Sequence, residues 1–535
     1  MCTTQEAKIA RYYIFDTLIS FAKHFSAELS ALVFDDFFAW FVGSQDAINV
    51  HDRTQFVDIL SLIASADAGK QVAVSGRLLA PIAAQVSQFI SWSGDPASLW
   101  RFICTKEDHD ILYTDLAIVS SCFRRLAVPV WSSQELVAAV VKPTLEVILN
   151  LVESAHRILS PQLRRAAIGD SAVLADIEAV YAPRNADKKD FRKSALFNLL
   201  ESLYVILGKI LESAGIFSAV PGLLGILTGR IIGTLPFSAS YDTVNMFLFR
   251  VMGPLIKRPS ITANDGSSPT LLPSQISTPS SAQLPAQRTA IGTFMKLSSD
   301  ALLLDWDPLV KSAELIRLAG GSKLNADHPA CGNSSSTGTD EDESTEIKKD
   351  ASLRSFSRKF FEWVLNDVLK NYGDMMGGDI EMTSFVAGLA VKSMSFPDSR
   401  VGVMSHSILL KLFTFFPLKQ NQKIQQGQNI GELELADERY VWASLEVLEG
   451  ITSSFLNKQA SSWQPQASFV EIMLYLLVFT APAQSSVAQK IAAVVPSFDS
   501  KKYAKCMKEI LAPKNLKKVQ LNKTKEIIRI VNNFI

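Results

Sequence analysis

Two consecutive amphipathic helices are the sequence feature that most constrains the fold of this chain. In residues 383–417 one apolar stripe leads to the turn 396–400, and a second apolar stripe follows it. Both stripes repeat at three- and four-residue spacing, which predicts helices with one buried face. The stripes comprise Phe385, Val386, Leu389, Ala390 and Met394, then Val403, Met404, Ile408, Leu409, Leu412, Phe413 and Phe416. The side chains predicted to lie mostly on the opposite face of the second helix are Ser405, His406, Ser407 and Lys411.

The turn predicts where the first helix ends and the second begins. Pro397 lacks a backbone N–H and restricts Phe396, so the first helix cannot continue through it. The same proline fits the first turn of a new helix, where Asp398 meets a favourable helix dipole, and Pro417 closes the second helix. One such pair cannot bury its apolar faces alone. Further pairs are therefore expected to stack on either side of it, as in a helical solenoid.

Similar helical stripes recur almost throughout the chain. The 535 residues exceed the size of one hydrophobic core, and 48% of them are hydrophobic while only 20% are charged. Helices are predicted at 12–25, 31–42, 55–64, 76–92, 96–104, 112–126, 132–159, 191–211, 221–233, 242–255, 291–318, 356–372, 436–456, 469–479, 485–495, 500–511 and 524–534. In the second of these segments, the residues expected to pack in the core are Phe34, Phe37, Phe38 and Trp40.

The predicted fold class is all-α, an α-α superhelix (HEAT/armadillo-like solenoid) with disordered loop insertions. Its helix pairs of about 35 to 45 residues fit HEAT or armadillo units better than ankyrin or tetratricopeptide repeats. Polar stretches interrupt the pattern twice. The predicted domains are an N-terminal array at 1–256, a disordered linker at 257–290, a short helical segment at 291–319, a disordered acidic loop at 320–352, and a C-terminal array with basic terminal helices at 353–535.

Charge and cysteine usage limit the partners and the compartment. Lys plus Arg and Asp plus Glu both number 53, so the global charge favours neither nucleic acid nor an anionic membrane as the main partner. The cysteines form no C-x-x-C motif or paired framework, which indicates a reducing compartment. Residues 1–14 do not read as a secretory signal. The apolar run 214–229 contains Pro221 and is shorter than the roughly 20 residues of a spanning helix, so a buried, broken helix pair is favoured over membrane insertion.

Residues of the kind used in catalysis or metal binding are present, but their spacing is weak. Glu107, Asp108 and Asp110 surround His109, yet a solvated turn explains that cluster better than an acid/base site. The closest approach to a metal-ligand pair is His328 with Cys331, and it lies in the predicted acidic loop. We therefore predict no catalytic, metal or cofactor site and no enzyme activity.

Two glycine-rich segments resemble phosphate loops only superficially. Gly222, Gly225 and Gly229 lie on apolar helical sequence, where close helix packing is the simpler explanation. Residues 319–323 (AGGSK) are better explained as a helix C-cap. Neither segment has the G-x-x-x-x-G-K-[ST] or G-x-G-x-x-G pattern after a strand.

The two strongest charge runs also have alternative interpretations. Residues 501–535 contain nine lysines and one arginine against Glu509 and Glu526. They can be a polar cap on the helical array, which we favour, or a surface for an acidic partner or nucleic acid. They carry only Tyr503 and Phe534 as aromatic residues, which is unlike a single-strand binding platform. The acidic run 340–346 is interpreted as a solvated spacer or, in a carrier, a competitor for basic ligands.

The helix pair also suggests a family. Residues 385–400 (FVAGLAVKSMSFPDSR) and 401–413 (VGVMSHSILLKLF) resemble a late repeat of karyopherin-β (importin-β superfamily) nuclear transport receptors, closest to the transportin-SR and importin-13-like branch. The resemblance covers roughly 356–535, and the chain is similar to the C-terminal half of such a receptor. Family members are typically much longer, and their main contacts with the GTPase Ran lie in N-terminal repeats that we do not identify in this sequence.

The resemblance implies a function. We expect a nuclear transport receptor that binds protein cargo on a helical superhelix and carries it through nuclear pores. Its expected partners are cargo proteins, Ran GTPase and nucleoporins, without direct nucleic-acid binding, and its expected location is the cytoplasm and nucleus, at the nuclear envelope. The alternative is a HEAT-repeat scaffold subunit of a larger complex. A fixed set of partners independent of Ran and its nucleotide would distinguish that scaffold.

Overall fold

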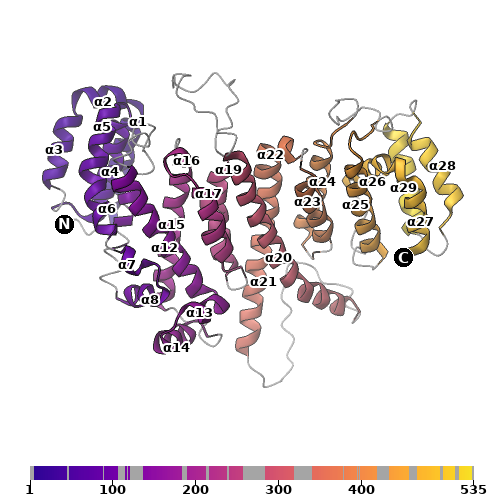
Figure 1. The fold of residues 1–535 in the computed structure, drawn as a ribbon, viewed down its shortest axis with the longest axis horizontal. Coiled ribbons are helices and arrows are strands. Elements are labelled where there is room, and N and C mark those ends of the chain that lie inside the picture. The colour runs from indigo at the N-terminus through magenta and orange to yellow at the C-terminus, as the bar shows by residue number, and fades with distance from the viewer. Residues whose placement is uncertain are drawn as a thin grey trace. The chain divides into compact units, whose positions relative to one another are not determined.

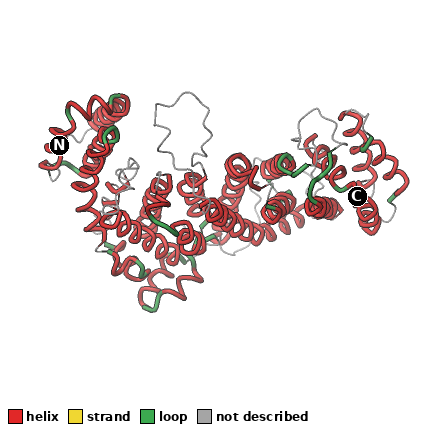
Figure 2. The backbone as a smooth tube through the Cα atoms, turned by 45° about the horizontal axis from the view of Figure 1, so that its top comes forward, coloured by secondary structure: helices red, strands yellow, loops and turns green. Residues whose placement is uncertain are grey.

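The residues that the computed structural model of the chain describes are mostly helical. These are residues 5–44, 47–87, 89–105, 112, 115–116, 118–120, 137–182, 190–212, 216–237, 240–256, 283–318, 340–376, 379–394, 396, 398–418, 433–456, 467–494, 498–512 and 517–532. Within these ranges the extended pairing is a single isolated antiparallel bridge between Leu418 and Leu435. The all-α prediction is confirmed, as Figure 2 shows.

The chain divides into two compact units. Unit 1 comprises Met1–Ser298 with Thr339–Lys349, and unit 2 comprises Ser299–Gly338 with Asp350–Ile535. Both boundaries fall inside helices, namely α20 (Gln283–Leu318) and α21 (Asp340–Trp363). The predicted linker and acidic loop lie largely outside the described residues, at 257–282 and 319–339.

Unit 1 is a succession of helices (Figure 1). Its first helices are α1 (Gln5–His24), α2 (Ser26–Leu32), α3 (Phe34–Ser44), α4 (Val50–Ala64), α5 (Ala68–Val74), η1 (Ser75–Leu79), α6 (Ala80–Ser87), α7 (Ile90–Ser93) and α8 (Pro96–Cys104). The next are η2 (Val137–Val141), α12 (Lys142–Leu159), α13 (Pro161–Ala167), α14 (Ser171–Val180) and α15 (Phe191–Glu212). The last before α20 are α16 (Ile216–Ala219), α17 (Leu223–Ile226), η4 (Leu227–Ile231), η5 (Ile232–Thr234), α18 (Tyr241–Phe247), η6 (Leu248–Met252) and α19 (Gly253–Ile256).

Helices α12 and α15 form the core of unit 1. Helix α12 packs against α6, α7, α8, α13 and α15, and α15 packs in turn against α18, α19 and η6. Gly208 allows the second contact, because a Cβ at this position would lie 1.9 Å from the carbonyl oxygen of Arg250. Any larger residue would push the two backbones apart. The close approach of these helices therefore depends on one glycine.

Unit 2 contains the predicted helix pair and its neighbours. Its helices are η8 (Val364–Val368), α22 (Leu369–Met376), α23 (Ile380–Ser393), α24 (Ser399–Phe413), α25 (Glu438–Leu456), α26 (Ala467–Phe479), η10 (Ala481–Ala483), α27 (Gln484–Val494), α28 (Ser500–Ile510) and α29 (Lys517–Asn532). Successive pairs stack, since α23 contacts α25 and α24 contacts α26. Each helix thus touches its counterpart in the next pair, which is how repeat proteins bury the faces that one pair leaves open.

The helix pair at 383–417 has the predicted boundaries. Asp398 caps α24, where its side chain accepts hydrogen bonds from the backbone N–H groups of Arg400 (3.0 Å) and Val401 (3.4 Å). Arg358 holds the same buried carboxylate through an ion pair of 2.6 Å. Pro397 lies outside the described residues. The turn is therefore a helix cap, anchored to a preceding helix.

The predicted buried face of α24 is confirmed at Ile408, Leu409, Leu412 and Phe413, but it was wrong at the start of the helix. Val403 is exposed, whereas Ser405 and His406 are buried. The buried stripe instead starts at Val401 and includes Ser405, because the Ser405 hydroxyl donates to the Val401 carbonyl (2.8 Å) and shares a 2.5 Å hydrogen bond with Ser393. A hydroxyl with such partners is readily buried.

The structure differs from the sequence prediction in three other places. The acidic run 340–346 forms the first turns of α21 instead of a loop, at the end of a helix where carboxylates are favoured. Trp40 is exposed, although Phe34 and Phe38 are core residues as predicted. Helices α13 and α14 were not predicted. Both are short, and they begin at the side-chain caps Ser160 and Asp170.

Candidate functional site

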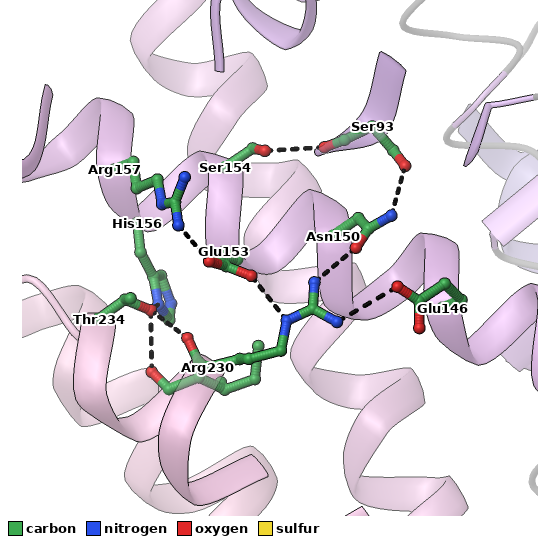
Figure 3. A network of polar contacts seen from close by, with 10 residues as sticks. Ser93, Glu146, Asn150, Glu153, Ser154, His156, Arg157, Arg230 and Thr234 are labelled. Atoms are coloured by element: carbon green, nitrogen blue, oxygen red, sulfur yellow. Dashed lines mark hydrogen bonds and ion pairs between the residues drawn. The ribbon is translucent and has the colours of Figure 1, made fainter. Parts of the chain in front are cut away.

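The densest polar cluster in unit 1 is centred on Arg230, which lies on η4 (Figure 3). Its guanidinium donates to Glu153 Oε2 (2.8 Å), Glu146 Oε1 (3.2 Å) and Asn150 Oδ1 (2.5 Å). These acceptors lie four and three residues apart on α12, so they form one stripe of that helix. The planar fork of an arginine can engage such a stripe at several points at once.

The cluster continues to a third segment of the chain. Asn150 donates through Nδ2 to the Ser93 hydroxyl (3.2 Å), and the Ser154 hydroxyl donates to the Ser93 carbonyl (2.7 Å). Ser93 is the last residue of α7, and all three side chains are buried. The cluster therefore joins α7, α12 and η4, as Figure 3 shows.

His156 lies at the other end of the cluster, fully buried on α12. Its Nδ1 is 3.1 Å from Thr234 Oγ1, and its Nε2 contacts the Tyr204 hydroxyl. Thr234 already donates its hydroxyl hydrogen to the Arg230 carbonyl (2.6 Å), so it must accept from Nδ1–H, and Nε2 accepts from Tyr204. Burial lowers the pKa of His156 to about 3 and raises that of Tyr204, so the histidine is neutral and the tyrosine protonated at neutral pH.

This arrangement is better suited to holding the three helical segments together than to catalysis. Both ring nitrogens of His156 are occupied, and the carboxylates near Arg230 neutralise its charge. Ser93 is hydrogen-bonded to Asn150 rather than to the histidine. No described group therefore combines a nucleophile with a free general base here. The cluster holds three helical segments in fixed register.

A second polar cluster ties α8, α14 and α15 together. The Asp176 carboxylate accepts from Trp100 Nε1 (2.8 Å) and from Arg192 (2.8 and 2.9 Å). Arg192 also pairs with Asp190 (2.9 Å), and its guanidinium lies 5.7 Å from the centre of the Trp100 ring. A cation over an aromatic face is stabilising. This cluster is again structural, and it is more exposed than the first.

The sequence candidates for chemistry are not brought together in the described structure. Residues 107–110, 320–323, His328 and Cys331 lie outside the described residues. The part of the chain that is described contains no group of three His, Cys, Asp or Glu side chains able to hold a metal ion.

The close-packing explanation for the glycines at 222–229 was wrong. A Cβ at Gly222, Gly225 or Gly229 would meet open space. Gly222 is needed for another reason, since its φ of +82° is a left-handed conformation that favours glycine. The glycine that permits close packing is Gly208, and the sequence offers no signal for it.

Helix α15 is long and apolar. It passes the length and hydropathy criteria for a membrane span, as does the bent pair 468–489 taken as one segment. Its apolar residues, however, are largely buried against α12, α18 and η6 inside unit 1. Such burial is typical of a core helix of a folded unit. The predicted broken pair at Pro221 is also observed, as α16 and α17.

Two surfaces remain once the buried clusters are explained. The N-terminal apolar face consists of Ile14, Leu18, Phe21 and Phe25, all exposed, with Tyr12, Tyr13, Leu32 and Trp40 exposed on the same three helices. The C-terminal basic face consists of exposed cations on α28 and α29, namely Lys501, Lys505, Lys508, Lys518, Lys525 and Arg529. The sequence predicted the basic run as a polar cap in preference to a surface for an acidic partner or nucleic acid, and it did not indicate the apolar face as a site.

Comparison with known proteins identifies no relative of this chain. No protein-family model, no curated protein and no solved structure matches it.

Proposed function

We propose that this chain is a helical-repeat scaffold that binds other proteins, and that its helix pairs form a HEAT/armadillo-like superhelix. The single observation that carries the proposal is the N-terminal apolar face. Ile14, Leu18, Phe21 and Phe25 are separated by four, three and four residues and are all exposed. An exposed apolar patch of this kind marks an interaction site more often than an idle surface.

The spacing of these residues defines the partner. Four residues on one stripe spanning 11 positions make a ridge about 16 Å long. Ridges at i, i+4 spacing pack into the grooves of another helix. Phe21 and Phe25, whose ring centres are 4.7 Å apart, form a continuous aromatic end to the ridge. The expected occupant is an amphipathic helix of a partner protein, about three turns long, with its own apolar residues three and four apart.

The test compares two variants with matched losses of exposed apolar area. L18S/F21S/F25S removes the face, and L304S/F197S/F249S removes one leucine and two phenylalanines elsewhere that are likewise at least 40% exposed. Cross-linking from Lys23, which is exposed on α1, should capture a partner peptide with apolar three- and four-residue spacing in the wild type and in the control. That cross-link should disappear in L18S/F21S/F25S.

Two outcomes would overturn this assignment. If L18S/F21S/F25S still binds the partner, the apolar face does not take part in the interaction. Light scattering that shows a dimer of the wild type but a monomer of this variant would assign the face to a second copy of the chain. In either case the scaffold proposal would lose the observation on which it rests.

A nuclear transport receptor is the second candidate, favoured by residues 385–413. These residues form the capped pair α23 and α24, the segment that resembles a karyopherin repeat. The stacking of α23 on α25 and of α24 on α26 supports a repeat architecture in the same region. Affinity purification with and without GTP-locked Ran separates the two candidates. A receptor should change partners with Ran and accumulate at the nuclear rim, whereas a fixed partner set would contradict it.

A further inference from the structure

We infer that the C-terminal basic face is a docking site for an acidic helical segment of a partner protein. The face is built on α28 and α29, which pack side by side (Figure 1). On α28 the cations Lys501, Lys505 and Lys508 are separated by four and three residues. On α29 the cations Lys518, Lys525 and Arg529 are separated by seven and four. At 1.5 Å per residue these two stripes are about 10 and 16 Å long.

Both stripes point away from the body of unit 2. Tyr503, Cys506, Met507 and Ile510 are the buried residues of α28, and they lie on the side of the helix opposite Lys501, Lys505 and Lys508. The buried residues of α29 are Gln520, Thr524, Ile527 and Ile528, and they lie on a different side from Lys518, Lys525 and Arg529. The cations are therefore accessible along the full length of each stripe.

The acidic residues of this region are already used. Between the two helices, Glu509 pairs with Lys523 (3.2 Å) and Glu526 pairs with Lys502 (3.7 Å). Within α29, Glu526 also pairs with Lys523 (3.2 Å). Glu471 on α26 pairs with Lys517 (2.6 Å). The six cations of the basic face have no ion-pair partner among the described residues. Their charge is thus left for an external anion, although the whole chain has a formal charge of zero.

The position of the cations argues against a role in fold stability. Lys501 and Lys518 lie in the first turns of α28 and α29, and neither first turn contains an acidic residue. Cations are unfavourable at this end of a helix, where the dipole is positive. A polar cap could use glutamate here and be more stable. The start of α28 is already capped by Asp499, whose side chain accepts from the backbone N–H of Lys502 (3.0 Å). An anion docked on the face would therefore be favoured by the lysines and by the N-terminal end of α29.

The chemistry of the face favours a protein over other polyanions. Tyr503 is buried, so α28 and α29 show no exposed aromatic side chain for stacking bases within their described residues. Among the side chains of α28 and α29 that the structure describes, Val519 is the only large exposed apolar one, which is too little to insert into a membrane surface. Carboxylates three and four residues apart on a helix match the spacing of the cations on α28. An acidic helix of two to three turns is the ligand that fits.

The experiment uses the intact chain and a fluorescent helical peptide of about 18 residues with glutamates three and four residues apart. K501E/K505E/K508E and K518E/K525E/R529E should each weaken peptide binding at least tenfold. The matched control K142E/K296E/K370E reverses three exposed lysines on other helices and should change binding less than twofold. The same peptide with glutamine for glutamate should not bind. Thermal melts verify that the variants remain folded.

Each alternative has its own result. If K142E/K296E/K370E weakens peptide binding as much as the face variants do, the weakening comes from net charge alone. That result would overturn the proposal. Tighter binding of a 20-bp DNA duplex, or of phosphatidylserine vesicles, than of the peptide, abolished by the same face variants, would reassign the face to nucleic acid or membrane. Failure of all three probes to bind the wild type would also overturn it.

Discussion

The helices α1–α3 and the pair α28–α29 expose opposite kinds of side chain. The first set exposes leucine, isoleucine and aromatic residues, and the second exposes lysine and arginine. Both sets are amphipathic helices with one buried face, so the fold alone does not explain the contrast. The contrast lies in the free face, where side chains add little to folding. It teaches that one chain can offer two docking surfaces that respond differently to salt, pH and mutation.

The two surfaces also differ in how their supporting helices are held. Unit 1 contains the polar cluster of Arg230, in which Ser93, Asn150, Ser154 and His156 are buried, while the side chains of Arg230 and Glu146 are 33% and 47% exposed. The basic pair of unit 2 is joined by partly exposed ion pairs, Lys523 with Glu509 and Lys502 with Glu526, in addition to its apolar core. Partly exposed ion pairs contribute less than about 1 kcal/mol each, whereas leaving a buried polar group without its hydrogen-bond partner costs about 1–3 kcal/mol. Perturbing the polar contacts should therefore damage unit 1 more than the C-terminal pair.

The largest expected effect is that of Arg230→Met. Removing the guanidinium leaves Glu146, Asn150 and Glu153 without their shared donor. Because Asn150 is buried while Arg230 and Glu146 are partly exposed, we expect unit 1 to lose about 1–3 kcal/mol of stability. Hydrogen exchange should accelerate in α12 and η4. It should stay unchanged in α28 and α29, so peptide binding to the basic face should survive while binding to the apolar face weakens.

The matched control for this change is Arg250→Met. Arg250 pairs with Glu201 at 3.3 Å, with both side chains largely exposed, and its loss should cost less than about 1 kcal/mol. Equal losses in the two variants would show that the Arg230 cluster is no stronger than a surface ion pair. The contrast between the two units would then fail.

Acid should destabilise unit 1 through His156. Burial lowers the folded-state pKa of this histidine to about 3, below its ordinary value, so the unfolded state binds the proton first. Stability is then complete above about pH 6.5 and falls as the pH drops, by about 2 kcal/mol between pH 6.5 and pH 5. In His156→Gln this contribution should be lost from urea melts, whereas His24→Gln, at an exposed position on α1, should retain it. Burial also lowers the pKa of His406 in unit 2 to about 4, so a slope of the same sign remains in both variants.

Asp115 acts in the opposite direction and must be separated from this effect. Burial raises the pKa of its carboxyl to about 6, so it contributes stability at low pH that is lost as the pH rises from about 4 through 6. The informative quantity is thus the difference between the wild type and His156→Gln at each pH. If that difference is independent of pH, the histidine is not neutral in the folded state.

Salt should separate the two surfaces directly. Raising the salt concentration from about 0.05 M to about 0.3 M shortens the screening length more than twofold, so acidic-peptide binding should weaken roughly tenfold. Partner binding to the N-terminal apolar face should change less than about twofold, since apolar burial is not screened. Equal salt sensitivity of the two interactions, measured by fluorescence anisotropy, would contradict the comparison.

Local pattern in the sequence predicts most of the helices but little of what joins them. The apolar periodicity that predicts α23 and α24 is contained within each helix, as is the capping role of Asp398. The start of the buried face of α24 was misjudged because Ser405 is polar by type, while its burial depends on Ser393 across the turn. A serine that finds partners inside the fold cannot be told from an exposed one by periodicity.

Contacts between residues far apart in the sequence cannot be predicted from local patterns. Arg230 meets Glu153 and Glu146 at separations of 77 and 84 residues, and Trp100 meets Asp176 at 76. Gly208 matters only because Arg250 passes directly over it. The basic run was visible in the sequence, but two facts needed coordinates: which lysines are paired, and that the others lie away from the core. Those facts separate a docking face from a polar cap.

The smallest expected effect concerns Lys518, and its sign is the informative part. Lys518 lies in the first turn of α29, where a carboxylate interacts better with the helix dipole than a cation does. K518E should therefore stabilise unit 2 by about 0.3–1 kcal/mol in thermal melts while it weakens acidic-peptide binding. K508E, in the last turn of α28, should weaken binding similarly but lower stability, because a cation is favoured at that end. A loss of stability in K518E would instead show that Lys518 stabilises the fold. That result would restore the cap explanation and remove the contrast between the two surfaces.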